Sequence, residues 1–244
     1  MTIELHNGDC LEIMKSIPSQ SVDMVLTDPP YNISQDYDFS RMRNFKTGLN
    51  FGKWDWEFDV TKWIYQGLDK LKKDGSLICF CSYRYLSHII DDIERNGGVV
   101  KDVIVWQKTN PMPRNRDRRY VQDMEFAIWA VKSKNSKWCF NRQNKNYDRG
   151  FLQSAICSGK EKTNHTTQKP VSILENLIVR HTNENDVVLD CFMGSGSTMI
   201  ACLNTNRKGI GIELDKHYFD VASKRITDHQ ATLESGFFIA RDKP

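Results

Sequence analysis

The chain has 244 residues, of which 39% are hydrophobic, and its mean hydropathy is −0.55. This length suits one large domain, or one domain with a sizeable insertion, and the apolar content is ample for a core. The polar mean, the lack of an apolar run long enough to span a bilayer, and an N-terminus without a secretory pattern argue against a membrane or secreted protein. We therefore expect a single cytoplasmic domain over residues 1–244.

The formal net charge is only +3, but the charge is distributed unevenly. Residues 101–169 contain 15 Lys and Arg against 6 Asp and Glu, so the rest of the chain is acidic. A basic middle in an otherwise acidic protein indicates a polyanionic partner. The alternative is a basic loop that is merely solvated.

The seven cysteines are an odd number, and the sequence contains no Cys-x-x-Cys. Cys79 and Cys81 are the closest pair, and they alternate with their neighbours in a strand-like run rather than forming a metal knuckle. We expect reduced thiols, most of them buried, and no metal site.

Apolar periodicity and turn residues predict strands that alternate with helices. The expected strands are residues 3–5, 22–26, 76–81, 99–106, 125–131, 187–190 and 210–213. The expected helices are residues 10–17, 61–73, 83–95, 170–181, 197–204 and 216–230. Residues 231–244 show no pattern and are expected to form a mobile tail.

Two long segments lack such periodicity. Residues 33–59 are polar and rich in aromatic side chains, and a loop of this length in a compact domain is usually functional. Its aromatic content argues against permanent disorder, so we expect it to become ordered over a ligand. Residues 132–162 are polar and basic, which suits an inserted recognition region.

The strand expected at residues 22–26 is followed by Thr27 and then by Asp28-Pro29-Pro30-Tyr31. Two prolines fix φ twice and remove two backbone donors, so the strand stops there. The stop leaves a carboxylate, unpaired carbonyls and an aromatic ring at the carboxyl end of a strand, where ligands bind in open α/β sheets. These groups suit an exocyclic amine on a planar base. On these residues alone, an ordinary strand-ending turn is an equal alternative.

A second motif lies late in the chain. The strand expected at residues 187–190 ends in Asp190, a turn with Gly194 and Gly196 follows, and the next strand ends in Glu213, 23 positions after Asp190. Glycines let the backbone approach a ligand closely, and an acid about 20 residues on can hold ribose hydroxyls. Tight packing of strand and helix is the alternative for the glycines alone. The combination with Glu213 and the Asp28 motif favours a nucleotide-type site.

With both motifs in place, the sequence resembles the DNA amino-methyltransferases that use S-adenosylmethionine, in the permuted motif order called the β class. The resemblance rests on Asp28-Pro29-Pro30-Tyr31 early, a basic middle, and Phe192-Met193-Gly194-Ser195-Gly196 late, and it covers nearly the whole chain. It implies a Rossmann-like α/β methyltransferase fold, with a mostly parallel seven-stranded sheet and helices on both faces. It also implies a target-recognition insertion at about residues 107–164 and a mobile loop that faces DNA at residues 33–59.

The resemblance further implies roles for individual residues. The implied catalytic residues are Asp28, Pro29, Pro30 and Tyr31. The residues implied to bind S-adenosylmethionine are Asp9, Cys10, Thr167, Gln168, Lys169, Asp190, Phe192, Gly194, Ser195, Gly196 and Glu213. Within this set, residues 167–169 would close over the methionine moiety and Glu213 would hold the ribose. For Asp9, a turn-stabilising role is nearly as good an interpretation. An ordinary surface histidine is an equally good interpretation of His165, so His165 is left out of the implied site.

The implied reaction transfers a methyl group to the N6 amine of adenine in double-stranded DNA, after the base is flipped out of the helix. Hydrogen bonds from the amine to the Asp28 carboxylate and the Pro29 carbonyl would draw the nitrogen toward tetrahedral geometry. Tyr31 would stack on the flipped base. This chemistry needs neither a covalent intermediate nor a metal.

Other activities are weighed against this one. Methylation of the N4 amine of cytosine is the alternative, although the family more often has Ser where this chain has Asp28. Methylation at carbon 5 of cytosine is excluded because no proline is followed by cysteine. Related protein or RNA methylation is disfavoured by the basic insertion and the permuted order. A catalytically silent DNA-binding protein would predict the loss of one motif, and both are intact.

Contacts to DNA are expected in the basic middle, chiefly from Lys108, Arg114, Arg116, Arg118 and Arg119, which flank two stiffening prolines. Ion pairs of Arg118 and Arg119 with neighbouring aspartates are the alternative. Residues 106–120 resemble the branch of cell-cycle-regulated adenine methyltransferases, without the C-terminal DNA-binding extension of that branch. The sequence leaves open the recognition site, a homodimer, and a cognate restriction endonuclease.

Overall fold

The computed structural model describes residues 2–31, 58–112, 117–118, 120–165 and 167–241. Most of the loop expected at residues 33–59 lies outside these ranges. Arg114, Arg116 and Arg119 lie outside them as well.

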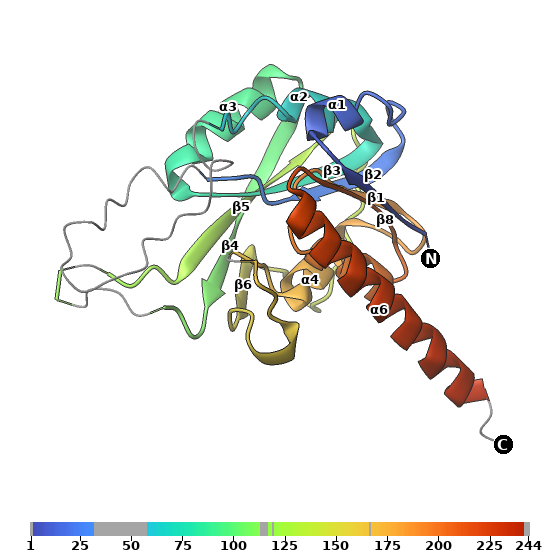
Figure 1. Cartoon of the computed structure of the whole chain (residues 1–244). Coiled ribbons are helices and arrows are strands. Elements are labelled where there is room, and N and C mark those ends of the chain that lie inside the picture. Colours follow the sequence, from blue (N-terminus) through green and yellow to red (C-terminus); the bar gives the residue numbers. More distant parts are fainter. Residues whose placement is uncertain (1, 32–57, 113–116, 119, 166, 242–244) are drawn as a thin grey trace.

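An eight-stranded sheet forms the centre of the described structure, with the strand order β1-β8-β7-β2-β3-β5-β4-β6 (Figure 1). Its strands are β1 (Ile3–Asn7), β2 (Val22–Thr27), β3 (Leu71–Cys81), β4 (Val99–Lys108), β5 (Met124–Val131), β6 (Phe151–Ser154), β7 (Val187–Asp190) and β8 (Lys208–Glu213). All neighbouring strands are parallel except β5, which is antiparallel to both β3 and β4. The expected α/β fold with a mostly parallel sheet is therefore confirmed.

The expectation of seven strands was wrong by one, and the additional strand is β6. It pairs in parallel with β4, from Val105 opposite Phe151 to Lys108 opposite Ser154. Its side chains alternate between exposed and half-buried, so no apolar run marks it in the sequence. The Trp106 indole on β4 donates a hydrogen bond of 2.9 Å to the Ser154 hydroxyl, which ties the edge strand to its neighbour.

Helices cover both faces of the sheet, as expected (Figure 1). They are α1 (Cys10–Ile13), α2 (Ile64–Lys70), α3 (Leu86–Arg95), α4 (Val171–His181), α5 (Ser197–Asn204) and α6 (Lys216–Arg241), with short 3-10 turns at Tyr83–Tyr85 and Gly159–Glu161. Helices α1, α2 and α3 lie on one face, and α4 and α6 lie on the other.

Successive side chains of the central strands pack into two separate hydrophobic cores, one on each face of the sheet. On β2, Val25 belongs to the core beneath α1, α2 and α3, whereas Met24 and Leu26 belong to the core beneath α4 and α5. Leu77 and Ile78 of β3 divide in the same way. Both faces of a parallel strand are buried, which is why the sequence of β2 is nearly continuously apolar.

Several boundaries differ from the sequence expectation, among them the start of β3 and the end of α6. The helix expected at residues 61–73 ends at Lys70, because Leu71 pairs with Val22 and begins β3. The segment expected to be a mobile tail is instead helical as far as Arg241. Asp215 directly precedes α6, and its carboxylate accepts hydrogen bonds from the backbone N–H groups of His217 and Tyr218 at 2.8 and 3.1 Å. Figure 1 shows the end of α6 extending away from the sheet.

All seven cysteines are free, and six of them are buried. This agrees with the expected reduced, mostly buried thiols. Within the part of the chain that the structure describes, no helix is long and apolar enough to cross a membrane.

Candidate active site

Three neighbouring parallel strands end at the same edge of the sheet and bring both sequence motifs together. Strand β8 ends in Glu213, β7 in Asp190, and β2 in Thr27, directly before Asp28. These carboxyl ends open onto a pocket of about 820 Å³. Because carboxyl ends of parallel strands are where α/β sheets bind ligands, this pocket is the candidate active site.

The pocket is lined by nearly every residue predicted to be catalytic or to bind the cofactor. The predicted residues that line it are Asp9, Cys10, Asp28, Pro29, Pro30, Tyr31, Thr167, Gln168, Lys169, Asp190, Phe192, Gly194, Ser195 and Glu213. Gly196 is absent from this lining.

Asp190 is buried, with 3% of its surface exposed, and its carboxylate is held by three donors. The hydroxyls of Thr27 and Thr198 donate at 2.7 and 2.5 Å, and the backbone N–H of Phe192 donates at 3.1 Å. Burial raises the pKa of Asp190 to about 6, although the three donors oppose the rise. Asp190 therefore fixes the turn that follows β7 and links it to β2.

Glu213 is positioned by the backbone on both sides of the pocket. Its two carboxylate oxygens accept hydrogen bonds of 2.8 Å from the N–H groups of Gly194 and Asp215. Burial raises the pKa of Glu213 above its ordinary value, and the two N–H donors oppose that rise. Each oxygen keeps a free lone pair, so the carboxylate can still accept hydrogen bonds from a ligand.

The two glycines of the late motif serve different purposes. Gly194 has φ +52°, and a Cβ there would lie 2.9 Å from Nε2 of His165, whose ring packs on Tyr218. Gly196 has φ +78°, and a Cβ there would lie 3.0 Å from Ile226 of α6. Gly194 therefore keeps the pocket open. The prediction for Gly196 is not supported by its position, since this glycine instead allows close packing of α6.

Asp9 and Cys10 line the pocket directly after β1, the strand that pairs with β8. The Asp9 carboxylate caps α1 and accepts hydrogen bonds from the N–H groups of Leu11 and Glu12 at 2.8 and 3.3 Å. This is the turn-stabilising role that the sequence left as an alternative, and it coexists with a place in the pocket wall. Burial raises the pKa of Cys10 to about 12, so its thiol is uncharged.

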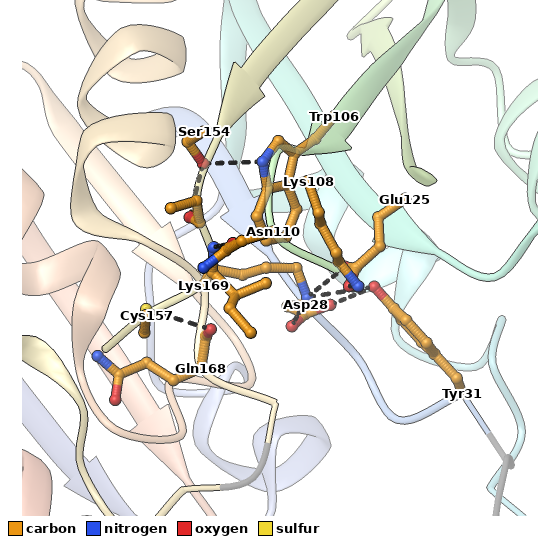
Figure 2. A network of polar contacts seen from close by, with 12 residues as sticks. Asp28, Tyr31, Trp106, Lys108, Asn110, Glu125, Ser154, Cys157, Gln168 and Lys169 are labelled. Atoms are coloured by element: carbon orange, nitrogen blue, oxygen red, sulfur yellow. Dashed lines mark hydrogen bonds and ion pairs between the residues drawn. The ribbon is translucent and has the colours of Figure 1, made fainter. Parts of the chain in front are cut away.

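A cluster of charged side chains surrounds Asp28 (Figure 2). The Tyr31 hydroxyl donates a hydrogen bond of 2.5 Å to Asp28 Oδ1, and Lys169 Nζ forms an ion pair with Oδ2. Lys169 Nζ also lies 3.1 Å from Glu125 Oε2, while Lys108 Nζ lies 2.6 Å from Glu125 Oε1. The cluster thus alternates in sign and joins β2, β4, β5 and the segment before α4.

The charges of this cluster follow from burial and from its ion pairs. Burial raises the pKa of Asp28, and Lys169 limits that rise. Burial lowers the pKa of Lys169, but the carboxylates of Asp28 and Glu125 outweigh it, so the pKa rises above its ordinary value and the ammonium is retained. Burial raises the pKa of Glu125, yet Lys169 and Lys108 bring it below its ordinary value.

The structure places Lys169 differently from its two sequence neighbours. Thr167 is exposed at the rim of the pocket. The Gln168 side chain accepts hydrogen bonds from Thr163 and donates one of 2.8 Å to the Glu161 carbonyl, so it stabilises its own loop. Of these three residues, Lys169 is the one that contacts Asp28 (Figure 2). The prediction that it closes over the methionine moiety does not account for this contact.

The residues predicted to contact DNA are only partly described. Arg118 is exposed in the connection between β4 and β5, where Tyr120 is also exposed, at 98% of its surface. Lys108 is different, because its ammonium is paired with Glu125 and only 20% of its side chain is exposed. Lys108 is therefore poorly placed to meet a phosphate, and the structure does not support its prediction as a DNA contact.

Several pocket residues were missed by the sequence analysis. They are Phe58, Lys62, Trp63, His165, Asp215 and Tyr218. Phe192 packs edge-on against the rings of Phe58 and Trp63, with centroid distances of 5.4 and 5.9 Å. His165, for which an ordinary surface position was an equal alternative, lies in the pocket wall. Its position two residues before Thr167 was a signal in the sequence that it could belong to the site. The contacts of Phe58 and Trp63 with Phe192 depend on how the helices pack, so no sequence pattern indicated them.

Comparisons with known proteins agree with this geometry. Residues 22–224 match the DNA methylase family N6_N4_Mtase. The Type II methyltransferase M.HinfI of Haemophilus influenzae is 30% identical over 241 residues, which cover 91% of this chain and 67% of that protein. The Type II methyltransferase M2.MboI of Moraxella bovis is 28% identical, and the match covers 96% of this chain and 90% of that protein.

Solved structures similar to this chain include DNA methyltransferases. The crystal structure of the M1.HpyAVI-SAM complex has 43% sequence identity and a TM-score of 0.75, covering 92% of this chain and 99% of that one. The PvuII DNA methyltransferase, which is cytosine-N4-specific, shares the fold with 20% identity and a TM-score of 0.72, covering 94% of this chain and 91% of that one. The chain belongs to the DNA methylase family.

Proposed function

We propose that this DNA methylase transfers a methyl group to the N6 amine of adenine in double-stranded DNA, with Asp28 as the acceptor that activates the amine. The family includes enzymes that modify either adenine or cytosine amines, so the choice between bases rests on the site. The observation that carries it is the carboxylate of Asp28, which lies in the pocket at the carboxyl end of β2. The early Asp28 motif and the late glycine motif support the β-class order.

The cofactor is S-adenosylmethionine, which supplies a methyl group on a sulfonium centre. The pocket fits such a molecule in size, because sites for small molecules typically enclose about 300–1,000 Å³. It also fits in chemistry. Glu213 offers an acceptor for hydroxyls, and Nδ1 of His165 is buried in the pocket wall without a hydrogen-bond partner among the described residues. Burial lowers the pKa of His165 to about 4, so the ring is neutral and one of its nitrogens is free to accept.

The residues around Asp28 explain how the amine would be activated. The lone pair of an exocyclic amine is conjugated into the ring, which makes the amine a poor nucleophile. A carboxylate and a backbone carbonyl that accept its two N–H groups localise that lone pair and favour a tetrahedral nitrogen. Positive charge develops on the nitrogen during transfer. An ionised Asp28 stabilises this charge more strongly than the neutral hydroxyl of a serine would.

Tyr31 acts beside the carboxylate. Its hydroxyl bond to Asp28 fixes the ring in the pocket wall, where it can stack on a flipped base. Flipping is required because the amine of a stacked base cannot reach a methyl group held inside the protein. The basic connection between β4 and β5, with exposed Arg118, is the proposed DNA contact.

Methylation of the N4 amine of cytosine is the second candidate, because the same acceptors suit that amine. The two activities separate in one experiment. DNA is incubated with the purified protein and S-adenosylmethionine, digested to nucleosides, and analysed by mass and retention time. The proposal expects N6-methyladenine. Finding N4-methylcytosine as the sole product would assign the enzyme to the other base.

A further inference from the structure

Lys169 occupies the place at Asp28 that a reacting amine needs. The Lys169 ammonium is an N–H donor to Asp28 Oδ2, as the target amine would be, and only 6% of its side chain is exposed. Asp28 Oδ1 already accepts from the Tyr31 hydroxyl. Each carboxylate oxygen therefore already accepts one hydrogen bond before a base enters, so the amine must either share the carboxylate with the Lys169 ammonium or displace it.

Glu125 provides a second acceptor for the same ammonium. Its Oε2 atom lies 3.1 Å from Lys169 Nζ, yet it is buried and makes no hydrogen bond to the described residues. Its other oxygen is held by Lys108 at 2.6 Å, which fixes the carboxylate in position. Figure 2 shows Lys169, Asp28 and Glu125 together in this cluster. A small movement of Nζ would exchange one partner for the other without exposing the charge.

We propose that Lys169 is a positioning residue that holds Asp28 in the absence of a base and passes to Glu125 when the target amine enters. Glu125 makes this exchange favourable, since a buried ammonium that left Asp28 without another acceptor would be costly. The role of Lys169 is thus to keep Asp28 ionised, and that of Glu125 is to release Asp28 for the amine. This inference rests on the proposed use of Asp28, but not on which base carries the amine.

Several titratable groups face Asp28 from the elements packed around it. They are Tyr31 after β2, Cys79 and Cys81 on β3, Glu125 on β5, Lys169 before α4, and Asp190 at the end of β7, with Lys108 on β4 acting through Glu125. Lys169 lowers the pKa of Asp28, whereas Glu125 raises it. Removing the charge of Lys169 and removing the charge of Glu125 should therefore move the acidic limb of the pH–rate profile in opposite directions.

The test measures the single-turnover rate of methyl transfer against pH, with DNA and S-adenosylmethionine saturating. In Lys169→Gln, Asp28 protonates more easily, so the acidic limb should move up by about 1–3 pH units. In Glu125→Gln, the limb should move down. The plateau should also fall by about tenfold, because the amine must then displace an ammonium that has no other acceptor. Lys169→Arg keeps the charge and should leave the limb near that of the wild type.

Lys72→Gln is the matched control, since Lys72 pairs with Asp23 at 2.8 Å outside the pocket and should leave the profile unchanged. The proposal would be overturned if Lys169→Gln and Glu125→Gln lost rate equally at every pH. It would also be overturned if their acidic limbs moved in the same direction. Weaker binding of S-adenosylmethionine by Lys169→Gln with an unmoved limb would also overturn it and assign Lys169 to the cofactor. If Lys169→Gln does not fold, Glu125→Gln and Lys169→Arg still decide. The profiles can be recorded whether the product is methyladenine or methylcytosine, so a failure here is distinct from a wrong choice of base.

Discussion

The hydroxyl of Thr27 donates a hydrogen bond of 2.7 Å to Oδ1 of Asp190, across two neighbouring parallel strands. Thr27 directly precedes Asp28, and Asp190 opens the turn that leads to Gly194. This buried bond thus helps to set the distance between Asp28, the proposed acceptor of the amine, and the proposed binding site for the methyl donor. Positioning of this kind matters because small displacements of reacting groups lower rates sharply.

Thr27→Val removes that bond and keeps the shape of the side chain. A buried acceptor that loses its partner destabilises a fold by about 1–3 kcal/mol, as measured by the free energy of unfolding in urea. The pKa of Asp190 should also rise beyond about 6, because the hydroxyl opposes the effect of burial.

The pH dependence of stability checks the second effect of Thr27→Val. A carboxyl whose pKa is higher in the folded state binds protons more tightly there, so stability falls as pH rises through the window between the unfolded and folded values. For the wild type, this window ends near the folded pKa of about 6. The deficit of Thr27→Val should therefore grow above pH 6. A deficit that is constant with pH, as expected for the exposed control Thr232→Val, would contradict the account.

Glu213→Ala should weaken the binding of S-adenosylmethionine by about 1–3 kcal/mol, because ligand hydroxyls lose a charged acceptor. Calorimetry measures this directly. Glu12→Ala is the control, since Glu12 is exposed and pairs only with Lys15 on the surface. Unchanged affinity in Glu213→Ala, with the fold intact, would remove Glu213 from the site.

Gly194→Ala tests whether the pocket needs an open turn. The left-handed backbone costs a residue with a Cβ about 1–2 kcal/mol. A Cβ at 2.9 Å from His165 should add to that cost and displace the pocket wall. Gly97→Ala is the matched control, because Gly97 has φ +86° and an added Cβ there meets nothing within 4 Å. Equal losses of stability and of cofactor affinity in both variants would show that the space beside Gly194 is unimportant.

Arg118→Ala should weaken DNA binding on cognate and scrambled duplexes alike and lower the slope of affinity against salt by about 1, if Arg118 contacts a phosphate. A contact to a base edge would instead relax preference at one position, at about 1–3 kcal/mol. Binding identical to the wild type on both duplexes would place recognition elsewhere in the basic middle. Lys108→Ala serves as the contrast. The Lys108 ammonium is paired with Glu125, so this substitution should lower turnover more than it lowers DNA affinity.

The parts of the site that the residues themselves predicted, apart from the family resemblance, lie at or directly after the ends of strands. Asp28, Asp190 and Glu213 each follow a short apolar run, and parallel pairing brings such ends to one edge. Glu125 could not be found in this way. It lies within β5, whose insertion as an antiparallel strand beside β3 is a property of the sheet, not of the local sequence.

The position of Lys169 shows the same limit. The family resemblance placed Lys169, with Thr167 and Gln168, over the methionine moiety. Its partner Asp28 lies 141 positions away, and only the folded chain brings them together. Lys108 was assigned to DNA because it belongs to a basic segment, whereas packing turned it toward Glu125. Strand β6 was missed because half-exposed edge strands carry no apolar run.

The central claim is that the Asp28 carboxylate activates the amine of adenine. The most direct test compares wild type and Asp28→Ala for two quantities on the same preparations, namely the yield of N6-methyladenine in digested DNA and the affinity for S-adenosylmethionine. The account predicts N6-methyladenine from the wild type, loss of the product in Asp28→Ala, and nearly unchanged affinity for the cofactor. Near-normal yield of N6-methyladenine from Asp28→Ala would contradict it.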